Sequence, residues 1–445
     1  MESILIQGAT VVNEGQTKSV DVRIEGERIT QVAQHIDPKE KDKLIDAKGL
    51  HLLPGLIDDQ VHFREPGLTH KADIASESQA AIAGGITSFI EMPNTQPQTT
   101  SVQAMNEKFQ LASGRAAANY SFMFGGTNDN LNEILNVDPT QVAGLKLFLG
   151  SSTGNMLVDQ PEVLEKIFSS TNLVISVHCE DEQTIKENTA HYKSIYGEDI
   201  PVELHPLIRS EEACYLSSSQ AIALAKKTGA RLHVFHLSTA KETDLFDNSI
   251  PLEEKKITAE VCVHHLWFSD KDYADKHTRI KWNPAVKTQA DQDGLWAALN
   301  DDRIDVLATD HAPHTLVEKQ NPYTQAPSGG PLVQHALLAL LTAAKNGKIS
   351  LEKLVQKACH NPAILFDIKD RGFLRPGYYA DMVLVDLQGK THVTKANLLY
   401  KCQWSPFEGT VFDARIHSTF VNGTLAYADG KVLNVNAGKK LEFDR

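Results

Sequence analysis

The sequence predicts an α/β protein in which a (β/α)8 TIM barrel occupies the middle of the chain and a small β-sandwich domain is built from both chain ends. Two patterns indicate this fold. Between about residues 55 and 370, short apolar runs alternate with longer helix-like segments, whereas both ends carry short stretches of alternating apolar and polar residues. The predicted boundaries are 1–54 and 371–445 for the β-sandwich and 55–370 for the barrel.

The middle of the chain contains eight apolar runs, each suited to one buried strand: residues 56–61, 86–92, 120–124, 144–149, 173–177, 232–237, 257–263 and 304–308. Intervening segments such as 72–83, 160–168, 211–227 and 289–299 are long enough for crossover helices. Eight such units in about 300 residues favour a closed barrel. An open doubly wound sheet is the alternative, but no Gly-x-Gly-x-x-Gly motif follows the early strands.

The chain ends follow a different pattern. Within residues 3–50, apolar and polar residues alternate over short spans separated by turn residues such as Gly15 and Gly26. The pattern returns in residues 380–386, 418–423 and 431–433. Because both ends share it, we expect them to form one domain into which the barrel is inserted.

The composition is typical of a soluble globular protein. Of 445 residues, 41% are hydrophobic and 23% charged, and no apolar run approaches the ~20 residues that span a bilayer. The N-terminus lacks the basic and apolar regions of a secretory signal. The five cysteines are scattered and lack Cys-x-x-Cys spacing, which argues against disulfides or a thiolate zinc site. We therefore expect a cytoplasmic protein with reduced thiols.

The net charge limits the classes of partner. At −13 the chain is acidic, and both nucleic acid and anionic membranes require a basic surface, so neither is an expected partner. An anionic small molecule would have to be held by local cations against the overall field. An arginine that points into a site is therefore informative.

Six of the eight predicted strands carry a polar residue within them or near their carboxyl end. In chain order these residues are His62, Asn94, Lys146, His178, His236 and Asp310. In a TIM barrel the chemistry gathers at the carboxyl ends of the strands, so residues placed this way would face one site.

Most of these residues also have an ordinary structural explanation. A single histidine after a strand is often a hydrogen-bonded buried side chain, Asp310 suits a helix N-cap, and Asn94 beside a proline suits a turn. Arg64 suits a surface ion pair. Lys146 differs, because a lysine inside an apolar strand is costly unless it is neutralised or modified. Jointly, three histidines, an aspartate and this lysine suit zinc or a similar divalent cation with open coordination positions.

Several segments resemble those of the dihydroorotases, a cyclic-amidase branch of the amidohydrolase superfamily. The similar segments run along nearly the whole chain: residues 54–58, 62–67, 83–87, 92–95, 144–146, 309–314 and 376–381. Related hydantoinases and allantoinases share the barrel and the metal ligands but typically lack the arginine that stands here at position 64.

The resemblance implies a cofactor and a mechanism. A carbamate on Lys146 would bridge up to two zinc ions; His178 and His236 would bind one ion, and His62 and Asp310 the other. Metal-bound hydroxide would be the nucleophile, and Asp310 would carry its proton to the leaving ring nitrogen. The implied reaction is the reversible hydrolysis of dihydroorotate to N-carbamoyl-L-aspartate in de novo pyrimidine biosynthesis.

The resemblance also implies how the small-molecule substrate is held. Arg64 offers a planar fork for its carboxylate, and Asn94 and His314 match positions that share this task. Asn283 resembles a position that contacts the pyrimidine ring, although it also suits a turn before a proline. Gly330 could offer a backbone group to the ring amide. We also expect a homo-oligomer, such as a dimer, and a substrate-closing loop at the glycine-containing segment 150–154.

Gln60 departs from the family pattern, which has His-x-His where this chain has Gln60-Val61-His62. An amide oxygen is a poor zinc ligand compared with imidazole, so Gln60 could bind weakly, water could replace it, or the ion could bind loosely. We expect two unequal metal sites, with the weaker one on His62 and Asp310. The alternatives are a hydantoinase-like cyclic amidase, which Arg64 disfavours, and a catalytically weak homologue that acts as a scaffold.

Overall fold

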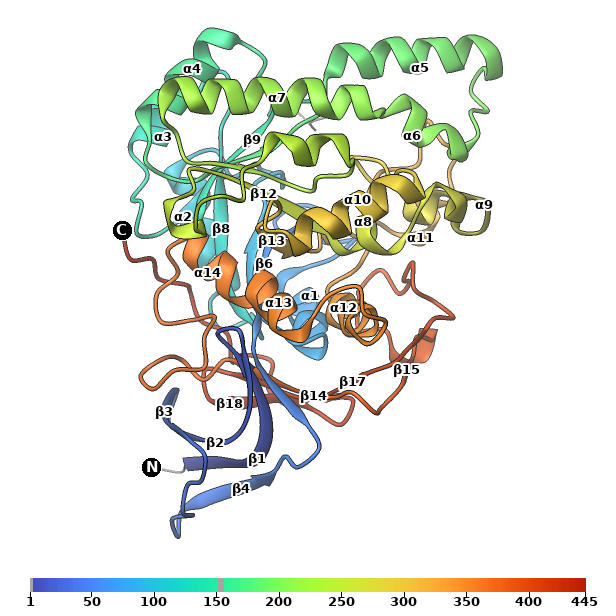
Figure 1. Cartoon of the computed structure of the whole chain (residues 1–445). Helices are drawn as coiled ribbons and strands as arrows, with labels where there is room; N and C mark the ends of the chain where they lie inside the picture. The colour runs from blue at the N-terminus through green and yellow to red at the C-terminus, as the bar shows by residue number, and fades with distance from the viewer. Residues whose placement is uncertain (1–2, 151–155) are drawn as a thin grey trace.

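Eight parallel strands form the central sheet of the computed structural model, which describes residues 3–150 and 156–445 (Figure 1). Each strand pairs with its neighbours in chain order. Their bounds are β6 Leu56–Val61, β7 Ile86–Glu91, β8 Asn119–Gly125, β9 Gly144–Phe148, β10 Ile175–His178, β11 Leu232–Val234, β12 Ile257–Cys262 and β13 Val306–Ala308. All eight overlap the apolar runs that predict them.

The first and last strands of this sheet meet, so it closes into a nearly complete barrel. Val61 forms a parallel bridge with His311, and the His62 backbone N–H donates to the His311 carbonyl at 2.7 Å. Asp58 on β6 accepts hydrogen bonds from the backbone and hydroxyl of Thr309, directly after β13. The predicted (β/α)8 barrel is therefore confirmed.

Helices connect the barrel strands, and further helices follow the last of these strands (Figure 1). Those of ten residues or more are α1 Ile74–Ala83, α2 Val102–Ala112, α4 Pro161–Ser170, α5 Glu182–Tyr196, α7 Glu211–Thr228, α10 Gln289–Asn300 and α12 Ala336–Lys345. The shorter ones are α3 Leu131–Leu135, α6 His205–Ile208, α8 Val263–Trp267, α9 Tyr273–Lys276, α11 Leu316–Lys319, α13 Leu351–Val355 and α14 Asn361–Leu365. Their ends follow from local sequence: Ser210 caps α7 by accepting from the Ala213 N–H, and Gly229 ends it at φ 77°.

A second, nine-stranded sheet combines both chain ends, and its blue and red strands lie together below the barrel in Figure 1. Its N-terminal strands are β1 Ser3–Asn13, β2 Gln16–Glu25, β3 Arg28–Ala33, β4 Asp42–Asp46 and β5 His51–Pro54. Its C-terminal strands are β14 Met382–Asp386, β17 Arg415–Val421, β18 Thr424–Ala428 and β19 Lys431–Val432. The antiparallel pairing of β5 with β14 joins the two ends, as the sequence predicts.

Strand alternation gives this sheet two apolar faces. On β14, Met382 and Leu384 pack in a core that belongs to the terminal domain. Val383 and Val385 point the opposite way and join the core of the barrel. The terminal sheet therefore has its own core and also supports the barrel.

Parts of the C-terminal region leave this sheet and return to the barrel. Tyr400 and Phe407 pack in the barrel core, as does Phe412 at the end of the small ribbon formed by β15 Thr391–His392 and β16 Val411–Phe412. Arg445 donates to the Ala143 carbonyl at 2.7 Å. Residues 371–445 thus contribute to both parts, and the domain boundaries at 54 and 370 stay a prediction.

Two further predictions concern access and membranes. Residues 151–155, most of the segment predicted to close on substrate, lie outside the described residues. At Gly150 a Cβ would lie 1.9 Å from the Glu180 carbonyl oxygen, so only glycine fits this close approach.

No helix in residues 3–150 or 156–445 is long and apolar enough to cross a membrane.

Candidate active site

The predicted metal ligands lie on the inner part of the barrel near the carboxyl ends of its strands. His62 follows β6, Lys146 lies within β9, His178 ends β10, and His236 and Asp310 follow β11 and β13. All five side chains are buried. This is the end of a TIM barrel at which active sites form.

His62 and Asp310 form one pair, with His62 Nε2 and Asp310 Oδ1 3.2 Å apart. His62 Nδ1 lies 2.8 Å from the Asn94 amide oxygen. Because that oxygen only accepts, Nδ1 carries the proton and Nε2 presents its lone pair toward Asp310. A metal-ligating histidine is commonly oriented in this way by a partner on its other nitrogen.

His178 and His236 form a second pair, with His178 Nδ1 and His236 Nε2 3.0 Å apart. His178 Nε2 lies 3.0 Å from Glu180 Oε2, and Glu180 is itself ion-paired with Arg209. The carboxylate favours a proton on His178 Nε2, which leaves Nδ1 as a lone pair facing His236. Two imidazole nitrogens at this separation can share one cation.

Lys146 has a buried amine with no hydrogen-bond partner among the described residues. Its Nζ lies 4.2 Å from the ring centroid of Phe235 and 4.9 Å from that of Phe148. Burial lowers the pKa of Lys146 to about 8, although the Asp310 carboxylate acts in the opposite direction. Lys146 is therefore neutral in a larger fraction of molecules than an ordinary lysine is. The neutral amine is the form that reacts with carbon dioxide.

The Asp310 carboxyl lies in the electrostatic field of the other candidate ligands. Burial raises the pKa of Asp310 to about 7, while the positive charges of Lys146 and His178 act to lower it. Three of the predicted site residues also have left-handed backbone: Arg64 at φ 68°, His236 at φ 42° and Asp310 at φ 48°. Such conformations cost free energy and concentrate at functional sites.

These residues fit a metal centre by their chemistry. Zinc prefers nitrogen and oxygen donors, and the site offers two paired imidazoles and an imidazole with a carboxylate. It also offers the buried amine of Lys146, which has no hydrogen-bond partner within residues 3–150 and 156–445. The individual ligand roles and the identity of the metal remain predictions.

Gln60 points to a different neighbour. β6 ends at Val61, and its register with β7 shifts between Asp58 and Val61, so positions 60, 62 and 64 do not continue one regular strand. Within the described residues, the one side-chain hydrogen bond of Gln60 is that with the Cys262 thiol, at 3.7 Å from its Oε1. Its amide has no such contact with His62 or Asp310.

Arg64, His314 and Lys71 form a basic cluster. Arg64 and His314 are buried, whereas Lys71 is half-buried and is ion-paired with Glu318 at 3.0 Å. Arg64 Nε donates to the Pro313 carbonyl at 3.0 Å, and its Nη2 lies 3.0 Å from His314 Nε2. Lys71 Nζ lies 3.0 Å from His314 Nδ1, and His314 Nε2 lies 3.0 Å from the Ser328 carbonyl oxygen.

The contacts determine the tautomer of His314. An ammonium only donates, so Nδ1 accepts from Lys71 and Nε2–H donates to the Ser328 carbonyl. Burial, together with the charges of Arg64 and Lys71, holds the pKa of His314 well below its usual range, which keeps the ring neutral. Arg64 Nη2 therefore faces another donor, and the two η nitrogens have no acceptor among the described residues, so their N–H groups are available for an anion.

Asn283 and Gly330, the two other predicted substrate contacts, differ in what they offer. The Asn283 side-chain oxygen is buried and has no hydrogen-bond partner among the described residues, so it can accept from a ligand. The Gly330 carbonyl already accepts from the Ala312 N–H at 3.0 Å. A Cβ at Gly330 would lie 2.9 Å from Trp282 and 3.0 Å from Trp404, which explains the glycine by packing.

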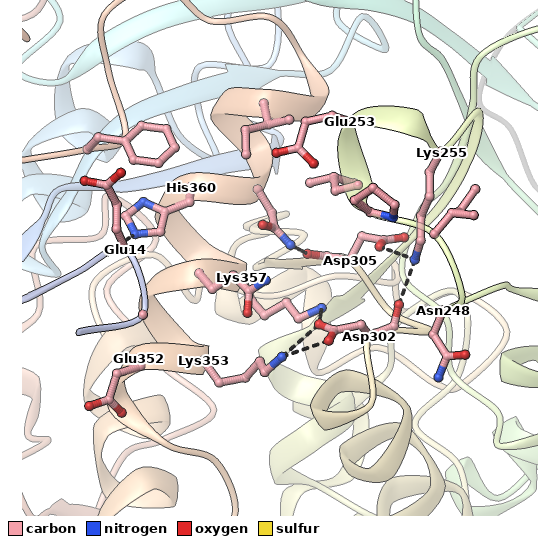
Figure 2. Close-up of a pocket in the computed structure, with 18 of the residues that line it drawn as sticks. Glu14, Asn248, Glu253, Lys255, Asp302, Asp305, Glu352, Lys353, Lys357 and His360 are labelled. Atoms are coloured by element: carbon pink, nitrogen blue, oxygen red, sulfur yellow. Dashed lines mark hydrogen bonds and ion pairs between the residues drawn. The ribbon is translucent and has the colours of Figure 1, made fainter. Parts of the chain in front are cut away.

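A cavity of about 720 Å³ lies at the opposite end of the barrel, among loops that precede β12 and β13 (Figure 2). Its lysines are already paired: Lys255 with Asp305 at 2.7 Å, and Lys353 and Lys357 with Asp302 at 2.9 and 2.8 Å. Each of these cations therefore already has a carboxylate partner, although Lys353 and Lys357 share Asp302. This end of a TIM barrel usually contributes stability rather than chemistry.

Two residues at the candidate site were missed by sequence reasoning. Lys71 contacts His314, and Glu180 contacts His178. Lys71 lies seven residues after Arg64 in a loop, where no periodicity signals its role. Glu180 follows His178 by two residues, and a carboxylate so close to a candidate ligand was the available signal.

Comparisons with known proteins agree with the geometry. Residues 51–426 match the model of the Amidohydrolase family. A dihydroorotase from Halobacterium salinarum is 33% identical over 97% of this chain and 98% of its own length. A dihydroorotase from Lactobacillus gasseri is 30% identical over 96% of this chain and 99% of its own.

Solved structures of related enzymes have the same fold. An L-hydantoinase (dihydropyrimidinase) from Arthrobacter aurescens superposes with a TM-score of 0.94, covering 99% of this chain and 100% of its own, at 27% identity. The family match and the dihydroorotase relatives confirm the predicted enzyme class, a hydrolase, and amidohydrolases generally use a metal. The chain belongs to the amidohydrolase family, and within it its similarity to dihydroorotases extends over nearly its whole length.

Proposed function

We propose that the protein is a dihydroorotase, which interconverts dihydroorotate and N-carbamoyl-L-aspartate in de novo pyrimidine biosynthesis. The observation that carries this proposal is the basic cluster of Arg64, His314 and Lys71. The cluster lies so close to the candidate metal ligands that, although burial raises the pKa of Asp310, the charge of Arg64 acts to lower it. A cyclic amide without a carboxylate would leave the Arg64 guanidinium buried and without an anion, which is costly. The basic cluster therefore favours a ring that carries a carboxylate.

The proposed cofactor is zinc, with up to two ions per chain and a carbamate on Lys146. His178 and His236 would hold one ion, and His62 and Asp310 the other, with the carbamate shared. A bound divalent cation supplies Lewis acidity, which activates water near neutral pH and polarises a carbonyl. The Nζ of Lys146 has no hydrogen-bond partner in the described part of the chain, which supports the carbamate, because an ammonium could not ligate a cation.

The proposed roles of the chain follow from its contacts. Asp310 is positioned to accept a proton from water and to return it to the ring nitrogen when the amide bond breaks. Asn94 holds His62 through its oxygen, and its NH₂ group, which has no partner among the described residues, can donate to the substrate carboxylate. Arg64 offers its free N–H groups to the same carboxylate. Asn283 would accept a hydrogen bond from the ring.

A hydantoinase-like cyclic amidase is the second candidate, since the Arthrobacter aurescens L-hydantoinase shares the fold closely. A scaffold with little activity is the third, because Gln60 stands where the family has a histidine. Small-molecule substrates, a homo-oligomer and a cytoplasmic location remain the expected context.

The discriminating experiment is an assay of zinc-loaded protein with dihydroorotate, hydantoin and dihydrouracil. We expect turnover of dihydroorotate to exceed that of the two uncharged rings by at least about 100-fold in kcat/KM, because only dihydroorotate engages Arg64. Faster turnover of hydantoin would establish the second candidate. Absence of turnover at every zinc loading would favour the scaffold.

Replacing Gln60 by histidine tests the proposed inequality of the two metal sites. An imidazole at position 60, where the family has a histidine, is expected to tighten the weaker zinc ion by about 10-fold or more, since imidazole is a better zinc ligand than an amide. The measurement is zinc retained per chain during titration with a chelator. Gln60→Leu, which cannot ligate, is the matched control. Identical retention curves for Gln60→His and the native protein would refute the assignment.

A further inference from the structure

Three buried side chains that the proposed reaction does not use converge inside the barrel: Asp59 of β6, His233 of β11 and Glu260 of β12. One ligand atom from each lies within 4.8 Å of the others, and all three residues are fully buried. We propose that this Asp59 cluster binds a divalent cation of the zinc or manganese type, in addition to any ions held by His62, His178, His236 and Asp310.

The spacing of the ligand atoms suits a cation. His233 Nε2 lies 3.3 Å from Asp59 Oδ2 and 3.9 Å from Glu260 Oε2. Tetrahedral ligands at zinc distances lie about 3.4 Å from one another. A charge-assisted hydrogen bond between imidazolium and carboxylate would be shorter, about 2.7–2.9 Å. The observed separations therefore leave room for an ion between the three groups.

The orientation of His233 suits the same ion. Its Nδ1 lies 2.8 Å from the Thr258 hydroxyl, and that hydroxyl donates to the Leu232 carbonyl at 3.2 Å. The hydroxyl oxygen must then accept, so Nδ1 carries a proton and Nε2 is the atom aimed at the two carboxylates. A metal-ligating histidine is typically fixed by such a bond on its other nitrogen.

The polar atoms that face one another in the cluster make no other hydrogen bond among the described residues. Neither oxygen of Asp59 has a hydrogen-bond partner among the described residues, and the same is true of Glu260 Oε2 and His233 Nε2. Two buried carboxylates are costly unless they are paired or coordinate a metal. One divalent cation neutralises both and leaves the imidazole neutral, whereas a single imidazolium leaves one negative charge.

Protonation of the cluster is the competing explanation for how the charge of its two buried carboxylates is balanced. Although burial opposes it, the Asp59 and Glu260 carboxylates raise the pKa of His233 to about 9. Burial and the neighbouring Asp59 raise the pKa of Glu260 to about 7. A protonated His233 with a protonated Glu260 would also balance the charge, so the experiment must distinguish an ion from these two protons.

The cation would stabilise the backbone of the candidate active site at His236 without taking part in the reaction. Glu260 Oε1 accepts from the His236 backbone N–H at 3.0 Å. Glu260 also contacts the Cys262 thiol at 3.2 Å, and Cys262 in turn contacts Gln60. An ion on Glu260 would therefore hold the backbone that presents His236 at its left-handed φ.

The test compares the metal content of zinc-saturated native protein, Asp59→Asn and Asp58→Asn by plasma mass spectrometry. Asp58 is the matched control, because it is a buried neighbour whose carboxylate binds Thr309 instead of the cluster. We expect Asp59→Asn to bind one zinc ion per chain fewer than the native protein, and Asp58→Asn to bind the same number. Equal content in native protein and Asp59→Asn would overturn the proposal.

A second measurement needs no variant and remains decisive if Asp59→Asn does not fold. Nitrogen-15 NMR of the zinc-saturated native protein should give a His233 ring with a proton on Nδ1 and none on Nε2. A ring protonated on both nitrogens under these conditions would overturn the proposal in favour of the two protons. Neither measurement depends on which substrate the enzyme uses.

Discussion

Asp310→Asn is expected to reduce kcat for dihydroorotate by about 10²- to 10⁴-fold, the range typical for loss of a general acid–base group. An asparagine has nearly the same shape but cannot accept a proton from water or return it to the ring nitrogen. The measurement is steady-state kinetics in both directions at matched zinc content, because Asp310 is also a proposed ligand. Native-like kcat at equal zinc content would remove Asp310 from proton transfer.

The pH profile of the same variant separates proton transfer from metal binding. Asp310 must be ionised to act as a base, so native kcat/KM should fall as the pH drops through its pKa. Burial raises that pKa to about 7 against the opposing charges of Lys146 and His178. A bound divalent cation would lower it further, which places the acidic limb below pH 7. Asp310→Asn should lack this limb. A variant that keeps the native limb would assign it to another group.

Arg64→Met is the substitution with the second largest expected effect. Losing one partner of a buried charged contact costs about 2–5 kcal/mol, which corresponds to about 30- to 4000-fold in kcat/KM for dihydroorotate. The loss should appear mainly in KM, because the substrate carboxylate is distant from the bond that breaks and is bound alike before and during the reaction. Activity on uncharged dihydrouracil should change little.

Arg64→Lys is the matched control for this prediction. It keeps the charge but loses the planar fork and the hydrogen bond from Nε to the Pro313 carbonyl, so an intermediate KM is expected. Melting temperatures of both variants show whether the fold is intact. An unchanged KM for dihydroorotate in Arg64→Met would exclude Arg64 from carboxylate binding and weaken the case against a hydantoinase.

Much of the fold was predictable because it depends on local patterns. Each barrel strand is a short apolar run, and the polar residues that follow these runs must share one end of a parallel barrel. The terminal sheet was predictable for the same reason, since apolar and polar residues alternate in both chain ends. The packing of Tyr400 and Phe407 in the barrel core was not predictable, because their local sequence does not indicate which distant residues they contact.

The sequence by itself determined which residue types stand at the strand ends, and these suit a divalent cation. Its resemblance to dihydroorotases implied a hydrolase with an arginine suited to a carboxylate. Only the tertiary structure decided which atoms meet. Lys71 reaches His314, 243 residues away, and thereby sets the tautomer that leaves Arg64 free. Gln60 turns to Cys262, and Asp59 meets His233 and Glu260, because the shift in β6 register and closure of the barrel bring non-neighbouring strands together. Contacts of this kind depend on ring closure across the whole barrel, and no local periodicity encodes them.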